Sequence, residues 1–248
     1  MKYLIIGASS GLGRELIYKF AKEKNNLVIV SRDSRDLMSL KSDLEIKFNI
    51  SVDYVALDFS SLSEIDNKLF SKKELLKNLQ GVLYPIGMMF DKDNQNLDVD
   101  SANKLINSNY LSIVYSIQKL SKYLTNNGKA SITGFGSVSS YLGREINIVY
   151  AGAKRALESY FESLAFEKDY KEINIQFYTL GYLDTNLSFG KNLKLPKGSI
   201  QKLAMRVYDN RNVKFKRMIY PKYWMLILFV LKLLPFSFII RFYKLLNR

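Results

Sequence analysis

Short apolar runs alternate with longer, helically periodic segments along most of the chain. The runs predict buried strands at 3–6, 27–30, 50–57, 81–87, 130–133 and 173–180. Between them, apolar residues recur at the spacing of one helix face, which predicts helices at 14–21, 37–48, 63–79, 102–124 and 149–170. Strands that alternate with helices in this way predict a doubly wound parallel sheet of the Rossmann-like α/β class.

The 248 residues are enough for one sizeable core, and they contain no internal repeat or low-complexity linker. We therefore expect one domain over residues 1–221, with a flexible substrate lid at about 186–217 and a last short strand at 218–221. Residues 222–248 follow it as an apolar and basic helical tail.

Three glycines, Gly7, Gly11 and Gly13, follow the first predicted strand and open the first predicted helix. This order places a pyrophosphate at a helix N-terminus, where exposed amides carry positive partial charge. The spacing G-x-x-x-G-x-G differs from the commoner G-x-G-x-x-G, and an ordinary βα loop is the alternative. The position directly after the strand favours a dinucleotide site. Its candidate binding residues are Gly7, Ser9, Ser10, Gly11, Leu12 and Gly13.

The second predicted strand ends in Ser31 and Arg32, at the place that faces the adenosine ribose in a dinucleotide fold. A hydroxyl and a guanidinium there favour the 2′-phosphate of NADP(H), whereas an acidic residue would favour NAD(H). Asp33 and Asp36 lie nearby and count against this preference, and Arg32 could also be a solvated residue of the turn. The third predicted strand ends at Asp58, which is a candidate acceptor for the adenine amino group or a helix N-cap.

Composition restricts the available chemistry. The chain has no Cys and no His, so we expect no disulfide, no thiolate or imidazole metal site and no Ser-His-Asp triad. Proton transfer must then use Tyr, Lys, Ser, Asp or Glu. Of the formal net charge of +14, residues 191–248 carry +13, from 14 Lys or Arg against one acidic residue, Asp209. The basic balance therefore belongs to the last quarter of the chain.

Tyr150 and Lys154 are four residues apart at the start of a predicted helix, so they share one face. An ammonium near a phenol favours the phenolate and draws its pKa down from about 10, which suits proton exchange with a carbonyl. The same spacing occurs at 18/22 and 115/119, so the pattern alone is weak. Only Tyr150 is preceded by a hydroxyl-rich turn that directly follows a strand. This turn contains Ser137, and in such sheets ligands bind at turns of this kind.

Taken in this order, the glycine motif, Asp58, an Asn in the fourth predicted helix, Ser137, Tyr150 and Lys154 resemble the short-chain dehydrogenase/reductase superfamily over about residues 1–190. The resemblance implies that Tyr150 is the general acid/base and that Ser137 holds the substrate oxygen. It implies that Lys154 binds the nicotinamide ribose and lowers the pKa of Tyr150.

The resemblance also implies that Asn109 holds a relay water behind Lys154, with Asn107 as a rival, and that Gly181 and Thr185 lie beside the nicotinamide. Three features depart from the family pattern. The usual Asn-Asn-Ala-Gly after the fourth strand is Tyr-Pro-Ile-Gly at 84–87, and Pro-Gly after the sixth is Leu-Gly at 180–181. The glycine-rich chain end of many members is absent.

The tail at 222–246 combines aromatic and aliphatic residues with Lys and Arg. Its longest uninterrupted apolar stretch, 224–231, is far below the roughly 20 residues of a spanning helix. We therefore expect two short helices in peripheral contact with the membrane interface, in preference to a subunit contact, a cap on the substrate pocket or a span. The chain shows no recognisable nucleic-acid module, so we expect no nucleic-acid partner.

Together these features predict an NADP(H)-dependent carbonyl reductase or alcohol dehydrogenase, with a substrate that is a small molecule, a lipid or a lipid-linked sugar. The alternative is a non-catalytic NADP(H)-binding regulatory protein on the same fold. Since no signal peptide precedes the first strand, we expect a cytoplasmic protein at the inner face of the membrane. We expect it to form a homodimer or homotetramer.

Overall fold

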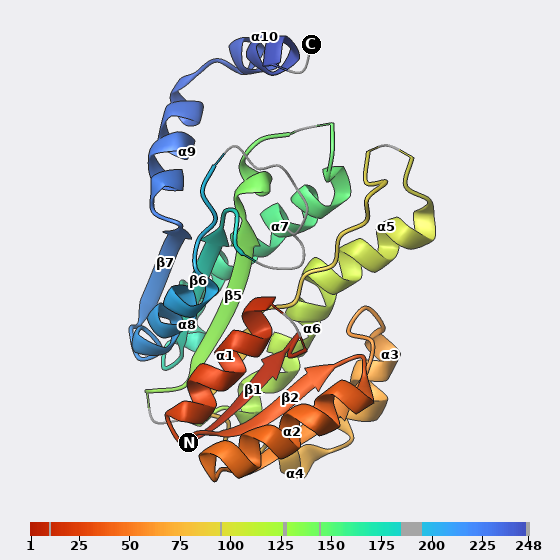
Figure 1. The fold of residues 1–248 in the computed structure, drawn as a ribbon, viewed down its shortest axis with the longest axis vertical. Coiled ribbons are helices and arrows are strands. Elements are labelled where there is room, and N and C mark those ends of the chain that lie inside the picture. Colours follow the sequence, from red (N-terminus) through yellow and green to blue (C-terminus); the bar gives the residue numbers. More distant parts are fainter. Residues whose placement is uncertain (10, 95, 126–127, 144, 185–194, 247–248) are drawn as a thin grey trace.

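The computed structural model describes residues 1–9, 11–94, 96–125, 128–143, 145–184 and 195–246, and is built on one parallel sheet (Figure 1). The strands lie in the order β3-β2-β1-β4-β5-β6-β7. They are β1 Lys2–Ile6, β2 Asn26–Ser31, β3 Val52–Ala56, β4 Gly81–Tyr84, β5 Ser131–Ser137, β6 Asn174–Leu180 and β7 Phe215–Tyr220. All neighbouring strands pair in parallel, which confirms the predicted Rossmann-like class.

Helices connect the strands and cover both faces of the sheet. The α-helices are α1 Gly11–Lys22, α2 Ser34–Phe48, α3 Leu62–Glu64, α4 Lys73–Leu76, α5 Val99–Ile106, α6 Ser112–Leu120, α7 Ile148–Leu164, α8 Ile200–Asp209, α9 Tyr223–Leu233 and α10 Phe236–Leu246. Shorter π and 3-10 segments are η1 Ile65–Phe70, η2 Asn107–Leu111, η3 Ser121–Tyr123, η4 Val138–Tyr141 and η5 Lys168–Tyr170.

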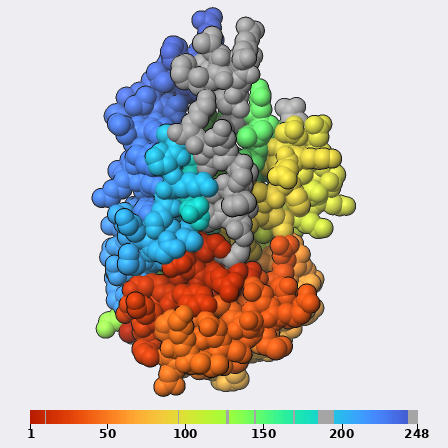
Figure 2. Space-filling view, in the orientation of Figure 1, coloured from red at the N-terminus to blue at the C-terminus, as the bar shows by residue number. Residues whose placement is uncertain are grey.

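Alternate residues of each central strand enter two separate cores. In β1, Leu4 and Ile6 pack with residues of α6 and α7, while Tyr3 and Ile5 pack with residues of α1, α2 and α8. Both faces of the sheet are therefore buried. This explains why its strands are continuous apolar runs, in which apolar and polar residues do not alternate. The first two helices form the lower part of the surface in the space-filling view, and the C-terminal segment stands along the opposite, upper edge (Figure 2).

The helix expected over 63–79 is interrupted. Helix α3 continues as the π-helical segment η1, which ends at Phe70, and α4 covers only four residues. Lys77 is extended and Asn78 has a left-handed backbone with φ of +57°. These two conformations turn the chain out of the helix before β4 begins.

The prediction of a lid over 186–217 is wrong for the second half of that range. Helix α8 packs on α1 and buries Leu203, Ala204 and Val207, and β7 is the edge strand beside β6. Helix α8 therefore belongs to the core of the fold, and β7 extends the sheet by one strand. Residues 186–194 lie outside the described residues.

The C-terminal tail forms two helices, as expected. Helix α9 begins just after β7 and runs beyond the end of the sheet, and α10 lies across its far end, away from the sheet (Figure 1). Within the described ranges, no helix combines the length and the apolar character that crossing a membrane requires.

Candidate active site

A cavity of about 760 Å³ lies at the carboxyl ends of the central strands. Its walls come from the glycine loop after β1, the end of β2, the segment after β4, the turn after β5, helix α7, the loop after β6 and helix α9. The cavity is at the topological switch point between β1 and β4, where doubly wound folds bind ligands. The predicted site residues that line it are Gly7, Ser9, Gly11, Leu12, Ser31, Arg32, Asp58, Ser137, Tyr150, Lys154 and Gly181. Ser10 and Thr185 lie outside the described residues.

The glycine loop brings backbone close to backbone. Gly7 has φ of +99°, and a Cβ there would lie 2.9 Å from the backbone of Ile86. A Cβ on Gly13 would lie 1.8 Å from the carbonyl oxygen of Gly7, so any side chain would push α1 away from β1. Gly11, at φ of +50°, begins α1 at the cavity wall. The loop therefore places the N-terminus of α1 directly at the cavity, an arrangement that fits the pyrophosphate of a dinucleotide.

The end of β2 is tied to the glycine loop. The Ser31 hydroxyl donates to the Ser9 hydroxyl at 2.8 Å, and the amides of Gly7 and Ala8 donate to Val30 O at 2.9 and 3.1 Å. These bonds hold the loop against the strand end that faces the ribose in this class of fold.

Arg32 is exposed at the cavity wall, and its acidic neighbours have other partners. Asp33 caps α2, accepting from the amides of Arg35 and Asp36 at 2.9 and 3.3 Å. The Asp36 carboxylate lies 3.8 Å from the guanidinium of Arg14. None of the ion pairs among the described residues includes Arg32. Its guanidinium is therefore placed to meet an anion in the cavity.

Asp58 braces the turn before α3. Its Oδ1 accepts from the amide and the hydroxyl of Ser60 at 2.9 and 2.8 Å, whereas the N-cap of α3 is Ser61. Asp58 also lines the cavity, so its role as an adenine acceptor stays a prediction.

Lys154 is the most deeply buried charged group of the cavity, with 2% of its surface exposed. Its Nζ donates to Phe135 O at 3.1 Å and to Ile86 O at 3.2 Å, so α7 is tied to the ends of β5 and β4. The same Nζ lies 5.9 Å from the centre of the Tyr150 ring. Burial lowers the pKa of Lys154 to about 7, because little water remains to solvate the ammonium. It can favour a Tyr150 phenolate only while it is protonated.

Tyr150 is positioned by a carboxylate that sequence analysis missed. Asp93, 2% exposed, accepts from the amides of Val149 and Tyr150 at 2.9 Å each, through its two carboxylate oxygens. Asn147 precedes α7 in a left-handed conformation without a side-chain cap, and the first turn of α7 has no acidic residue. The N-terminus of α7 is therefore capped from the loop after β4. Nothing in the sequence signalled this arrangement, because Asn147 is itself a common N-cap residue.

Ser137 is the last residue of β5, and its hydroxyl lies 2.8 Å from that of Ser139. The amide of Ser139 donates to Ser137 Oγ at 3.2 Å, and the Ser140 hydroxyl donates to Ser137 O at 2.6 Å. The turn thus orients the serine hydroxyl with its own backbone and neighbours.

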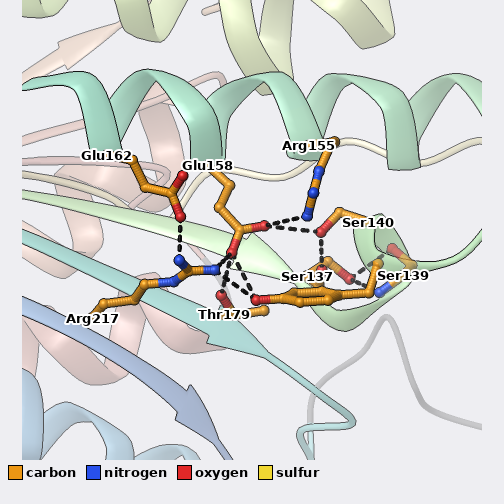
Figure 3. Close-up of polar contacts among 9 residues, drawn as sticks. Ser137, Ser139, Ser140, Arg155, Glu158, Glu162, Thr179 and Arg217 are labelled. Atoms are coloured by element: carbon orange, nitrogen blue, oxygen red, sulfur yellow. Dashed lines mark hydrogen bonds and ion pairs between the residues drawn. The ribbon is translucent and has the colours of Figure 1, made fainter. Parts of the chain in front are cut away.

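A buried carboxylate, Glu158 on α7, supports this turn from behind (Figure 3). It accepts from the Tyr141 hydroxyl at 3.0 Å and, more weakly, from the hydroxyls of Ser140 and Thr179 at 3.4 Å. The guanidinium of Arg217 on β7 pairs with it and neutralises its charge. The sequence did not reveal this cluster, because its members come from four elements far apart along the chain.

Asn109 is fully buried in η2, a π-helical segment of the kind that is frequent at functional sites. Its amide nitrogen donates to Met88 O at 2.9 Å and to Leu105 O at 3.0 Å, and its oxygen accepts from the amide of Met88 at 3.2 Å. The side chain therefore pins the segment after β4. A water-holding role for Asn109 or Asn107 stays a prediction.

The other two Tyr/Lys pairs lie away from the cavity. Tyr115 and Lys119 both bind Asp66, each at 2.5 Å, and Tyr18 donates to Asp43 at 2.6 Å. Only the pair at 150/154 meets the serine turn and the glycine loop. No group of three or more acidic side chains in the described part of the chain could hold a metal ion.

Comparison with known proteins identifies the family of this chain. The family model for short chain dehydrogenases matches residues 2–195. The chain is 27% identical over 190 residues to the NADP-dependent 3-hydroxy acid dehydrogenase of Schizosaccharomyces pombe, which covers 75% of this chain and 72% of the relative. It is 26% identical over 199 residues to a very-long-chain 3-oxoacyl-CoA reductase of Vanderwaltozyma polyspora, covering 74% of this chain but only 55% of that protein.

Among solved structures, a short-chain dehydrogenase from Sphingobium yanoikuyae in complex with NADPH superposes with a TM-score of 0.77 at 19% identity, covering 89% of this chain and 87% of that one. The chain therefore belongs to the short-chain dehydrogenase/reductase family and is an NAD(P)-dependent oxidoreductase.

The burial of Lys154 predicts a pH dependence of stability. Its pKa is about 7 in the folded protein and about 10.4 in the unfolded chain, so between these values the unfolded state binds one more proton. The free energy of unfolding should rise with pH in this window by up to about 1.4 kcal/mol per unit, relative to Lys154→Met. Urea unfolding of both nucleotide-free proteins between pH 6 and pH 9 measures this difference, and parallel pH profiles would contradict it.

The cap on α7 predicts that Asp93→Ala lowers stability by about 1–2 kcal/mol, because two partly buried amides lose their acceptor. The displaced Tyr150 should also lower kcat while the KM for NADPH changes little. Asp93→Asn keeps one acceptor oxygen, so its stability and its kcat should lie between those of wild type and Asp93→Ala. Asp91→Ala, at an exposed position of the same loop, is the control. Equal losses of kcat in Asp93→Ala and Asp91→Ala would exclude a specific role of Asp93 in positioning Tyr150.

Proposed function

We propose that this protein is an NADP(H)-dependent carbonyl reductase, or alcohol dehydrogenase in the reverse direction. The observation that supports this most is that one cavity contains the glycine loop, Ser137, Tyr150 and Lys154 together. Bound NADPH would supply the hydride that is added to the carbonyl carbon, becoming NADP⁺. Ser137 would hold the carbonyl oxygen, and Tyr150 would donate a proton to it, so that a secondary alcohol leaves.

Lys154 would act through its charge and its hydrogen bonds. Hydroxyls of a bound ribose would add partners for its ammonium beside the two carbonyls that it already contacts. Such partners favour the protonated form, against the effect of burial, and a protonated Lys154 favours ionisation of Tyr150. Asn109 would maintain this region by keeping the segment after β4 in place.

Arg32 is the basis for proposing NADP(H) over NAD(H). It stands at the strand end beside the ribose site, its acidic neighbours are engaged elsewhere, and a guanidinium matches phosphate geometry. The S. pombe relative is named for the same cofactor.

The substrate we propose is a lipid or a lipid-linked sugar ketone. Much of the cavity wall is apolar, and it includes Met88, Met89, Phe90, Leu142, Ile146, Leu183, Leu228 and Leu231. Such a lining accepts a long aliphatic chain better than a free sugar. The V. polyspora relative is named for a very-long-chain acyl substrate.

We further propose that the enzyme works at the inner face of the membrane, which residues 222–246 contact peripherally, and that it is a homodimer or homotetramer. Apolar side chains exposed on α5 and η2, far along the chain from the tail, support a separate subunit contact. They are Val99, Ile106 and Leu111.

Tyr150→Phe tests catalysis. With the proton donor removed, NADPH oxidation by aliphatic ketones of increasing length should fall by about 10²–10⁴-fold. NADPH affinity should change little, as measured by quenching of Trp224, the single tryptophan, which lines the same cavity. Tyr115→Phe, from a pair outside the cavity, is the matched control. Wild type that binds NADPH but reduces no carbonyl would favour the regulatory protein.

Arg32→Ala tests the cofactor preference. Loss of a charge-assisted contact to the 2′-phosphate should lower kcat/KM for NADPH by about 10–100-fold and leave that for NADH nearly unchanged. Arg35→Ala, at a neighbouring exposed cation outside the cavity wall, should change neither. An unchanged ratio of NADPH to NADH efficiency in Arg32→Ala would refute the assignment.

A further inference from the structure

Helix α9 has two apolar faces that meet different surroundings. Trp224, Leu228 and Leu231, at helical spacing, line the cavity. Leu226, Phe229 and Leu233 lie on the opposite side, about 170° around the helix axis, and are 69%, 61% and 68% exposed. A helix that is apolar on both sides is stable in water only if something covers the second side.

The inner face of α9 is firmly attached to the site. The indole of Trp224 packs so closely on Gly181 that a Cβ there would lie 2.0 Å from Nε1. Near the other end of the helix, the ammonium of Lys232 lies 5.2 Å from the centre of the Tyr141 ring, and Tyr141 in turn binds Glu158. The helix therefore spans the cavity from the loop after β6 to the turn that follows Ser137.

Helix α10 follows α9 directly, and its residues Phe236, Phe238 and Ile240 are also exposed. The surface formed by these residues with Leu226, Phe229 and Leu233 is here named the tail surface. Its charge is one-sided, because residues 222–248 contain five Lys or Arg and no Asp or Glu. Lys222 and Arg241 are exposed on the same segment.

These charges decide which partner fits the tail surface. A second copy of the chain, docked through the same helices, would bring five cations against five. An anionic bilayer supplies what the surface lacks, since it offers negative headgroups to Lys and Arg and an apolar interior to Leu and Phe. The helices are too short to cross it. The arrangement is that of helices lying in the membrane interface.

We propose that the tail surface binds anionic lipid and that α9 forms the partition between the bilayer and the catalytic cavity, so that a carbonyl lipid reaches Ser137 and Tyr150 from the membrane along this helix. The inference rests on the proposed carbonyl reduction for its chemistry. The binding of lipid by the tail surface does not depend on that chemistry and is measured separately.

The test uses the full chain and the variant L226Q/F229Q/L233Q, which changes only the outer face of α9. Binding is measured by co-sedimentation with vesicles of phosphatidylglycerol and phosphatidylcholine, and with phosphatidylcholine alone. Turnover is measured with a long-chain ketone dissolved in the mixed vesicles and with a short, water-soluble ketone. The control M38Q/I46Q/M205Q removes exposed apolar residues from α2 and α8, to which no binding role is assigned.

Wild type and the control should bind the mixed vesicles, less tightly as salt rises, and should bind pure phosphatidylcholine weakly. The α9 variant should lose binding and turnover of the vesicle ketone by about ten-fold or more, while turnover of the soluble ketone changes less than about two-fold.

Unchanged vesicle binding by the α9 variant, or equal binding to both kinds of vesicle, would overturn the anionic lipid surface. So would a tail-dependent dimer, dissociated by the α9 variant in analytical ultracentrifugation, that binds no vesicles. If wild type binds the mixed vesicles but reduces neither ketone, the proposed function is refuted, while the binding of anionic lipid by the tail surface is supported.

Discussion

The hydrogen bonds from the buried Lys154 ammonium to the carbonyls of Phe135 and Ile86 hold the candidate site together. They join α7, which bears Tyr150, to the ends of the two strands that border the cavity on one side. Water is nearly excluded at this point, so the two carbonyls and any bound ligand must solvate the charge. The same burial that fixes the lysine makes its protonation, and hence its effect on Tyr150, sensitive to what occupies the cavity.

Much of the positioning in this site uses backbone groups. Ile86 contributes its carbonyl to Lys154 and its backbone to the close approach of Gly7, and Met88 binds Asn109 through both its amide and its carbonyl. This explains how the family segment after the fourth strand can become Tyr-Pro-Ile-Gly here. The side chains differ from the family pattern, and the peptide groups of Ile86 and Met88 bind the lysine and the asparagine.

Charge is handled differently on the two sides of the cavity. On the α7 side, the carboxylates of Asp93 and Glu158 are buried and fully engaged, one by helix amides and the other by Arg217 and hydroxyls. On the tail side, cations are exposed and no carboxylate accompanies them. The first arrangement stabilises a fixed geometry for catalysis. The second leaves unbalanced charge and apolar area at the molecular surface, which is the condition for binding an anionic lipid interface.

Local patterns determined the succession of strands and helices along the chain, the glycine loop, and the pairing of Tyr150 with Lys154. Each of these depends on residues that are close in sequence. Local patterns could not reveal Asp93 as the cap of α7, the cluster around Glu158, or the burial of α8 where a lid was expected. These depend on contacts between segments that are 17 to 59 residues apart or more, as with Tyr141, Arg217 and Glu158. The tertiary structure alone decided them, because only folding brings such segments to one place and removes the water between them.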